Sequence, residues 1–94
     1  MYILEIEHEV FNFDAWKKAF ENDPIDRKKA GVRRYSIHQG TDNPKFVVIH
    51  LTFDQLTDAN KTLDSLKNLW KNIEGKVMIN PQVRILKMVE SREL

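Results

Sequence analysis

FNFDAWKKAF, residues 11–20, decides the fold, because it marks the point at which a strand gives way to a helix. Asn12 is a favoured N-cap residue, since its side-chain oxygen can accept a hydrogen bond from a free backbone N–H of the first turn. Asp14 places a negative charge in that turn, where the helix dipole favours it. Phe11 and Trp16 have the spacing of a hydrophobic staple. The segment therefore predicts a helix that starts directly after Asn12.

Residues 2–10 precede this helix and alternate in polarity, which is typical of a half-buried strand. One face carries Tyr2, Leu4, Ile6, His8 and Val10, and the other carries Ile3, Glu5, Glu7 and Glu9. We expect the helix to stop near Asn22, because Pro24 disfavours a helical residue before it. Asp23 and Pro24 then predict a short second helical piece that ends at Gly31, so that the first helical region is long and kinked.

Two further strands are predicted over residues 32–39 and 45–53, joined by the turn-rich segment 40–44. A register in which Gln39 faces Lys45 gathers one apolar set of side chains on a single face. That set comprises Tyr35, Ile37, Val47, Ile49, Leu51 and Phe53. The other face then carries Arg34, Ser36, His38, Phe46, Val48 and His50, with Arg34 opposite His50.

A second helix follows, capped by Asp54 or Thr57 and ended by Gly75. Its apolar stripe has helical spacing and comprises Leu56, Ala59, Leu63, Leu66, Trp70 and Ile73. Asn80 and Pro81 are then expected to break the chain before a fourth strand over residues 82–90. Both faces of that strand carry apolar residues, with Val83, Ile85 and Val89 opposite Leu86 and Met88.

The order strand, helix, strand, strand, helix, strand predicts an α+β fold of the ferredoxin-like type, βαββαβ. Its antiparallel four-stranded sheet has two helices on one face, and the other face is left open. Ile3, Phe46 and Val48 lie on that open face. Apolar surface left uncovered by a small chain is often buried against a second copy. We therefore expect a homodimer joined through the open sheet face.

Size and composition narrow the function. The 94 residues fit one domain over 1–94, which buries only about 60–65% of its unfolded surface and so has a marginal core. The net charge of +1 gives no bulk attraction to nucleic acid or to an anionic membrane. Cysteine is absent, which excludes disulfides and suits a reducing compartment, and no apolar run or leader points to a membrane. We expect a cytoplasmic protein with no nucleic-acid or membrane partner.

Three stretches, HEVFNFDAWKKAF (8–20), DRKKAGVRRY (26–35) and DNPKFVVIHLTF (42–53), together resemble the dimeric α/β-barrel superfamily, especially its small antibiotic-biosynthesis-monooxygenase-like proteins. The resemblance fades after Lys61. It implies two ferredoxin-like subunits that form a barrel from their sheets, with a pocket between sheet and helices in each subunit. The matching positions are His8, Glu9, Val10, Asp14, Ala15, Trp16, Arg27, Ala30, Gly31, Val32, Tyr35, Asn43, Pro44 and the strand that ends at Phe53.

Members of this superfamily with known activity include cofactor-independent oxygenases of polycyclic phenols and haem-degrading enzymes. For the haem-degrading members, the resemblance implies an Asn on the first strand, a Trp in the second helix and a His after that Trp. This chain has His8 on the first strand and no histidine after Trp70, so it departs from that pattern. We therefore expect no cofactor.

His8 is the candidate catalytic residue, because it lies on the apolar, helix-facing side of the first strand. A buried imidazole there can act as a general base or orient a phenolic substrate, and the alternative is a core histidine bonded to a carbonyl or to water. Trp16, Tyr35 and Trp70 are candidate substrate-binding residues of an aromatic pocket, and the alternative for them is plain core packing.

Two other groups of residues are not expected to form a functional site. His38 and His50 lie about four residue pairs apart in the predicted hairpin, roughly 13 Å, which is too far to bind one metal ion. We expect no metal site and place both histidines in the dimer interface. The basic cluster is interpreted as a solvated helix end; it comprises Arg27, Lys28, Lys29, Arg33 and Arg34. RNA binding is rejected, because the third strand lacks central aromatics and the glutamates of the first strand repel phosphate.

The leading hypothesis is a small homodimeric α/β-barrel protein that binds an apolar or aromatic small molecule, with cofactor-independent monooxygenase-like activity if it is an enzyme. The alternative is a non-catalytic dimerisation or ligand-sensing module whose pocket is filled by its own side chains. An open hollow beside His8 favours the first, and continuous packing there favours the second.

Overall fold

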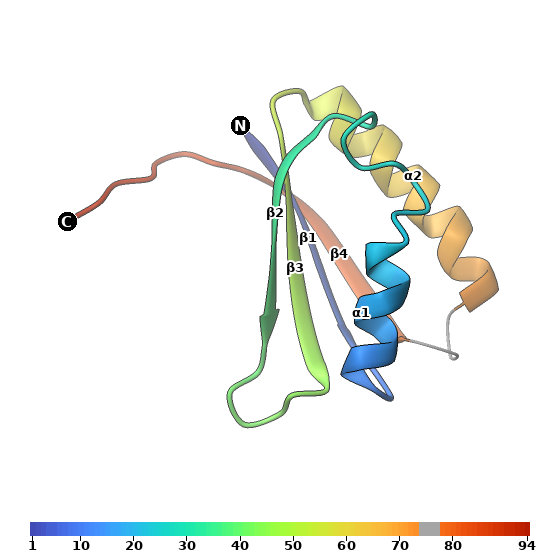
Figure 1. Ribbon diagram of the computed structural model, residues 1–94. Coiled ribbons are helices and arrows are strands. Elements are labelled where there is room, and N and C mark those ends of the chain that lie inside the picture. The colour runs from blue at the N-terminus through green and yellow to red at the C-terminus, as the bar shows by residue number, and fades with distance from the viewer. Residues whose placement is uncertain (74–77) are drawn as a thin grey trace.

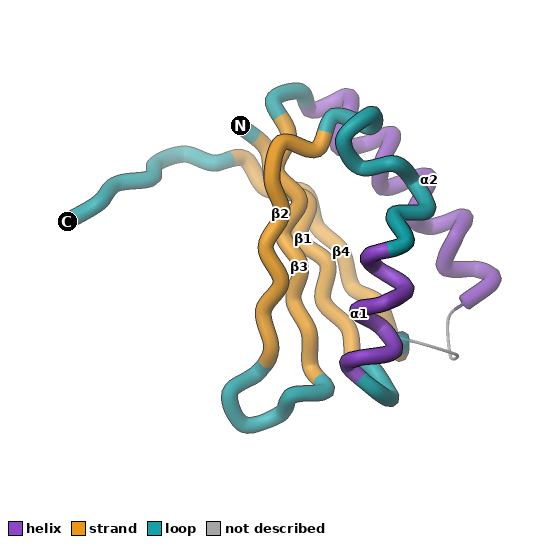
Figure 2. The backbone as a smooth tube through the Cα atoms, in the orientation of Figure 1, coloured by secondary structure: helices purple, strands orange, loops and turns teal. Residues whose placement is uncertain are grey.

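The computed structural model describes residues 1–73 and 78–94. Its elements are β1 (Tyr2–Glu9), α1 (Phe13–Glu21), β2 (Val32–Gln39), β3 (Phe46–Phe53), α2 (Leu56–Ile73) and β4 (Ile79–Lys87). The strands pair antiparallel in one sheet of order β2-β3-β1-β4. Both helices lie on the same side of this sheet (Figure 1 and Figure 2). The predicted α+β ferredoxin-like fold with helices on one face is confirmed.

Helix α1 begins and ends where the sequence predicts. The extended backbone of Asn12 lets its side-chain oxygen accept a hydrogen bond of 2.9 Å from the Ala15 N–H, and Asn22 is the C-cap. The hydrophobic staple is not formed, because Phe11 stays exposed. Trp16 is buried on the opposite, sheet-facing side of the helix start, and the helix begins at the Asn12 cap with Asp14 in its first turn.

The predicted second helical piece after α1 is wrong, and residues 23–31 form turns instead. Asp23 and Asp26 have φ angles of 51° and 54°, a left-handed conformation that interrupts a right-handed helix. The Asp23 carboxylate accepts a hydrogen bond of 2.9 Å from the Arg27 backbone N–H, which satisfies the turn locally. Gly31, at φ 101°, leads the chain into β2 in a conformation that favours glycine.

The β2–β3 hairpin forms as predicted, but its register differs by two residues. Gln39 pairs with Val47 rather than Lys45, because the connection is longer than expected and is closed by a bond of 2.9 Å from the Gly40 N–H to the Phe46 carbonyl. A shift of two keeps every side chain on its predicted face. Val47, Ile49, Leu51 and Phe53 are therefore buried as expected. The cross-strand neighbours change, and Arg34 lies opposite Thr52 instead of His50.

Helix α2 packs on the sheet through a face slightly rotated from the predicted stripe. Ala59, Leu66 and Trp70 are buried as expected, but Leu56 is exposed and Thr62, which the stripe omits, is buried. The helix starts directly after Gln55, so neither Asp54 nor Thr57 occupies the cap position. Asp54 instead accepts a bond of 2.8 Å from the Arg33 side chain. The predicted stop at Gly75 lies outside the described residues.

Strand β4 begins three residues earlier than predicted. It includes Asn80 and Pro81, which were expected to break the chain. Asn80 has φ 51°, and the pairing of β4 with β1 shifts between Glu7 and Glu9. Asn80 and Pro81 therefore form an irregularity within an edge strand, where such residues are tolerated. The strand ends at Lys87, and Val89 lies beyond it, exposed, in a tail that runs away from the sheet (Figure 1).

The core lies between the sheet and the two helices. Its most deeply buried side chains come from β1 and β3, the central strands, and from the residue that follows β1; they are Leu4, Val10, Val47, Ile49, Leu51 and Phe53. Val83 and Ile85 of β4 pack against this cluster, which shows the face of β4 that the sequence left open. Neither described helix is long and apolar enough to cross a membrane.

Candidate functional site

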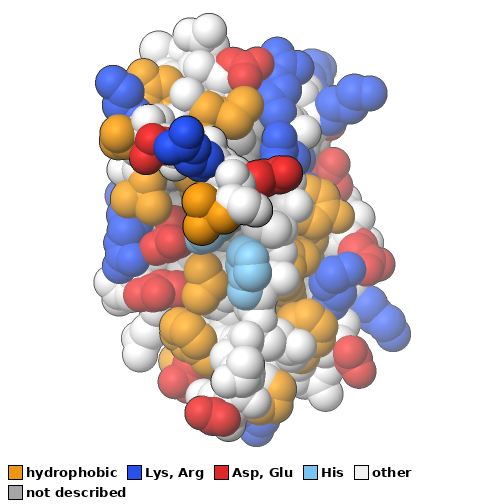
Figure 3. All heavy atoms as spheres, turned by 90° about the vertical axis from the view of Figure 1, so that its left-hand side faces the viewer, with side chains coloured by type: hydrophobic (Ala, Val, Ile, Leu, Met, Phe, Trp, Pro, Cys, Tyr) orange, Lys and Arg blue, Asp and Glu red, His pale blue; other side chains and the backbone are white. Residues whose placement is uncertain are grey.

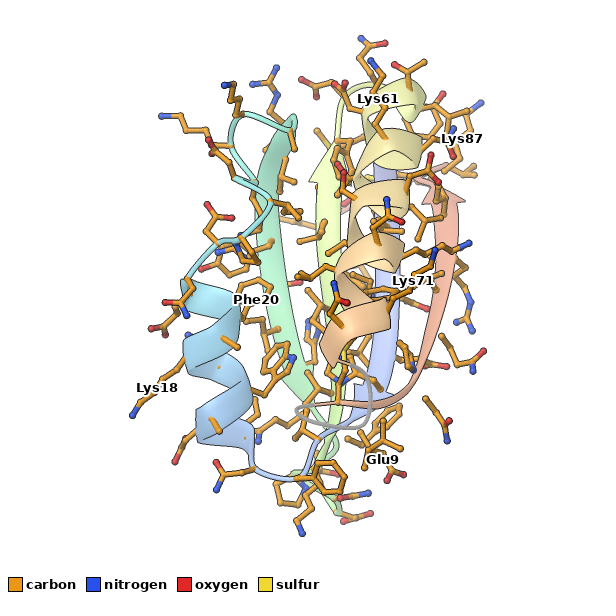
Figure 4. The ribbon with its side chains drawn as sticks, turned by 90° about the vertical axis from the view of Figure 1, so that its right-hand side faces the viewer. Glu9, Lys18, Phe20, Lys61, Lys71 and Lys87 are labelled. Carbon is orange, nitrogen blue, oxygen red and sulfur yellow. The ribbon has the colours of Figure 1, made fainter. Side chains whose placement is uncertain are left out.

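A cavity of about 250 Å³ lies between the sheet and the helices. In the view from the helix side, α1 and α2 stand apart over the sheet, and Phe20 lies on the side of α1 that faces α2 while Lys18 points the other way (Figure 4). An apolar cavity of about 150 Å³ is enough to hold benzene. The lining comprises Ile6, His8, Ile49 and Leu51 from the sheet, Trp16, Ala19 and Phe20 from α1, Leu66, Leu69 and Trp70 from α2, and Asn22, Pro24, Ile25, Arg27 and Met78 from connections.

His8 is the polar group on the sheet side of this cavity. Its side chain is 3% exposed, and its Nδ1 lies 3.2 Å from the carbonyl oxygen of Glu9. A carbonyl only accepts, so the hydrogen bond requires a proton on Nδ1, and in the neutral ring Nε2 then keeps its lone pair. Burial lowers the pKa of His8 below the usual 6.5, against a smaller opposing effect of the Glu9 bond. At neutral pH the ring is a neutral base.

Aromatic rings form a row along α1 beside His8. The ring centres of His8 and Trp16 are 5.4 Å apart, and those of Trp16 and Phe20 are also 5.4 Å apart. Trp16 and Phe20 are four residues apart, so they are neighbours on one helix face. The row gives the cavity a wall of aromatic rings tilted to one another, which suits an aromatic ligand.

The structure brings three of the four predicted site residues together. His8, Trp16 and Trp70 all line the cavity, although they come from three different elements. Tyr35 does not line it. Tyr35 is 47% exposed, because β2 is an edge strand, and its ring contacts the Phe20 ring from outside at a centroid distance of 5.1 Å.

Arg27 is a cavity residue that the sequence reasoning missed. Its interpretation as part of a solvated helix end is wrong, because its side chain is 14% exposed and lines the cavity. Nη1 donates a hydrogen bond of 2.8 Å to the Phe20 carbonyl, and the guanidinium carbon lies 3.9 Å from the centre of the Phe20 ring. The left-handed turns at Asp23 and Asp26 bring it there, and no periodic pattern in the sequence signals them.

The open face of the sheet carries an ion-pair network at its centre. Glu5 accepts bonds of 2.8 Å from His50 and 2.6 Å from Arg84, and Arg84 also lies 3.5 Å from Glu7. The hydrogen bond from His50, followed by the contact with Arg84, lowers the pKa of Glu5 below its usual range despite partial burial. Figure 3 shows this face, on which hydrophobic side chains alternate with charged ones around central histidines.

The expected separation of His38 and His50 is wrong. Their ring centres lie 5.2 Å apart, because the two-residue change of register brings His50 to a diagonal position from His38. His38 Nδ1 is bonded to the Val48 carbonyl at 3.1 Å and His50 to Glu5, so each ring has a partner in the sheet. Within residues 1–73 and 78–94, no group of three or more His, Asp or Glu side chains has the geometry of a metal site.

Comparison with known proteins finds a shared fold at low sequence identity. A protein of Nitrosomonas europaea assigned as an antibiotic biosynthesis monooxygenase superposes with a TM-score of 0.71 at 19% identity, over 96% of this chain and 100% of that one. The chain has the ferredoxin-like fold of the antibiotic biosynthesis monooxygenase-like proteins. No protein-family model matches the sequence, and a search of curated proteins finds no match.

Two further solved structures extend the comparison. SnoaB, a cofactor-independent oxygenase from Streptomyces nogalater, has a TM-score of 0.77 at 7% identity and covers 96% of this chain and 94% of its own. A dimeric ferredoxin-like protein from an uncultured marine organism has a TM-score of 0.70 at 11% identity, with 97% of both chains covered. At these identities the likeness is one of fold.

Proposed function

We propose that this protein binds a small apolar or aromatic molecule between its sheet and helices and acts on it as a cofactor-independent monooxygenase-like enzyme. The cavity of about 250 Å³ beside His8 carries the proposal. A non-catalytic module with a filled pocket would pack its own side chains continuously there, so the open volume favours a ligand. The fold shared with a cofactor-independent oxygenase adds support.

His8 has the state that the proposed chemistry needs. Its neutral ring, held by the Glu9 carbonyl, presents Nε2 as a base for the hydroxyl proton of a bound phenol. Dioxygen is the oxidant. In the oxidation of the phenol to a quinone, one oxygen atom of dioxygen becomes the new carbonyl oxygen. The other oxygen atom leaves as water together with two hydrogens, which come from the phenol O–H and from one ring C–H. Trp16 and Trp70 would hold the ring system in place.

The same proposal includes a homodimer formed through the open sheet face. Leu86 is partly exposed there next to half-buried Ile3, and half-buried Val48 and Phe46 lie toward the other end of the same face, which leaves apolar surface for a second copy to cover. The Glu5–Arg84 network at the centre of the face would then be shielded from water, which strengthens such ion pairs. A dimeric protein shares the fold, which supports the assignment.

Quinone formation from a polycyclic phenol under air, followed by absorbance and oxygen uptake, tests the activity. We expect His8→Ala to abolish turnover while the dimer persists, and Lys61→Ala, at an exposed position of α2 outside the cavity, to leave turnover unchanged. Full turnover in His8→Ala would remove His8 from the mechanism. Binding of the phenol, read from quenching of Trp16 and Trp70 fluorescence, without turnover in the wild type would favour the ligand-sensing alternative.

A further inference from the structure

Arg27 gives the cavity a charge of one sign. Among the described residues that line it, Arg27 is the one side chain that is always charged, and neither aspartate nor glutamate lines it. The rest of the lining is apolar except for His8 and Asn22. A guanidinium that is only 14% exposed, beside an apolar space, exerts a stronger field than one fully in water. The cavity is therefore electrostatically matched to a ligand with negative charge near Arg27.

The guanidinium is held in position with hydrogen-bonding capacity left over. Nη1 is bonded to the Phe20 carbonyl, Nε lies 3.4 Å from the Asp23 carboxylate, and the Phe20 ring supports the flat face at 3.9 Å. Within the described part of the chain, no group accepts a hydrogen bond from Nη2. A positioned arginine with a vacant N–H is a suitable partner for a carboxylate or phenolate oxygen.

We propose that the cavity selects an amphipathic organic anion. The apolar body of the ligand lies between the helices and the sheet, along the row from His8 through Trp16 to Phe20, and its negatively charged oxygen group binds Arg27 at the end of that row. This inference rests on the proposed ligand-binding function and specifies its ligand class.

Two fluorescent probes that differ by one anionic group test the proposal. N-phenyl-1-naphthylamine is neutral, and 1-anilinonaphthalene-8-sulfonate is the same ring system with a sulfonate. Both brighten in an apolar site. We expect the wild-type protein to bind the anionic probe more tightly, and Ala19→Trp, which fills the cavity, to weaken both probes. If neither probe binds, or if Ala19→Trp leaves both affinities unchanged, the proposed binding function fails.

Substitutions at Arg27 and its partner test the charge itself. Arg27→Gln should weaken the anionic probe by about tenfold or more and the neutral probe by less than about twofold, as expected for loss of a charge-assisted hydrogen bond. Asp23→Asn keeps an oxygen acceptor for the Arg27 backbone and should strengthen the anionic probe alone, because the guanidinium loses its neutralising partner. Arg33→Gln, an exposed arginine outside the cavity, is the matched charge control.

Three results would overturn the selectivity while leaving ligand binding intact. One is equal weakening of both probes by Arg27→Gln, which would mean that Arg27 only holds the turn in place. Another is an unchanged affinity for both probes in Arg27→Gln. The last is loss of anionic affinity in Arg33→Gln as large as in Arg27→Gln. If Arg27→Gln does not fold, Asp23→Asn and Arg27→Lys decide, since both keep the positive charge and should retain preference for the anionic probe.

Discussion

The imidazole of His8 and the indole of Trp16 lie with their ring centres 5.4 Å apart and their planes inclined by 60°. One belongs to β1 and the other to α1, and a short connection capped by Asn12 separates the two elements. The contact joins the end of β1 to the first turns of α1, and both rings form part of the cavity wall. The residues that stabilise the start of the fold are therefore also residues of the candidate site.

Trp16→Ala should destabilise the protein by about 3–5 kcal/mol, because a buried aromatic side chain is removed and a void is left. Phe13, Phe20 and His8 lose ring contacts at the same time. Urea unfolding measures the loss. Phe11→Ala, an exposed aromatic next to the same cap, should change the free energy of unfolding by no more than about 0.5 kcal/mol. Equal effects of the two substitutions would contradict the packing described here.

His8 should make stability depend on pH between neutrality and mild acid. Its pKa is lowered in the folded protein by burial, so the unfolded chain binds a proton first as the pH falls through 6.5. Stability from this group is complete above 6.5 and is lost as the pH drops toward the lowered pKa. Urea unfolding at pH 7.5 and pH 5.5 should show a smaller acid loss in His8→Gln than in the wild type.

Lys61→Gln provides the control for that measurement, because Lys61 is exposed on α2, outside both the core and the open sheet face. The control variant should lose as much unfolding free energy between pH 7.5 and pH 5.5 as the wild type does. The lowered pKa of Glu5 affects stability only below its usual value of 4.5, outside the pH range compared. A His8→Gln protein with an undiminished acid loss would show that His8 is protonated equally in the folded and unfolded states.

Leu86→Arg should dissociate the proposed homodimer. Leu86 is 38% exposed on the open sheet face, and a charge there would be buried without a partner in the dimer. Sedimentation velocity over a range of concentrations measures the change in mass. Leu56→Arg is the matched control, since Leu56 is 43% exposed on α2 and lies on the helix side of the molecule. A wild-type monomer, or a dimer that tolerates Leu86→Arg, would refute this interface.

Gly31→Ala should destabilise the protein by about 1–3 kcal/mol, since φ of 101° is strained for any residue with a Cβ. The added Cβ would also lie 2.7 Å from the Asp58 carboxylate oxygen. Thermal and urea unfolding measure the loss. Combining it with Asp58→Ala should recover only the part due to the close contact. Full recovery in the double variant would mean that the backbone conformation contributes no strain.

Local rules predicted much of the fold because they act over a few residues. The Asn12 cap and the alternation of β1 depend on neighbours along the chain and placed their elements correctly, and the spacing of α2 identified the helix but not its cap. The failures occur where a longer connection or a turn decides. The register of the hairpin follows from the hydrogen bond between Gly40 and Phe46. Because the predicted register differs from it by two residues, the prediction placed His38 and His50 too far apart.

The sequence by itself determined the order of elements and the faces of the strands, because hydrophobic periodicity and capping are properties of neighbouring residues. It also placed His8, Trp16 and Trp70 toward the core. Only the tertiary structure decided that these three share one cavity, that Tyr35 stays outside it, and that Arg27 enters from a turn. The physical reason is that left-handed turns and strand order bring distant residues together without leaving a periodic signal in the chain.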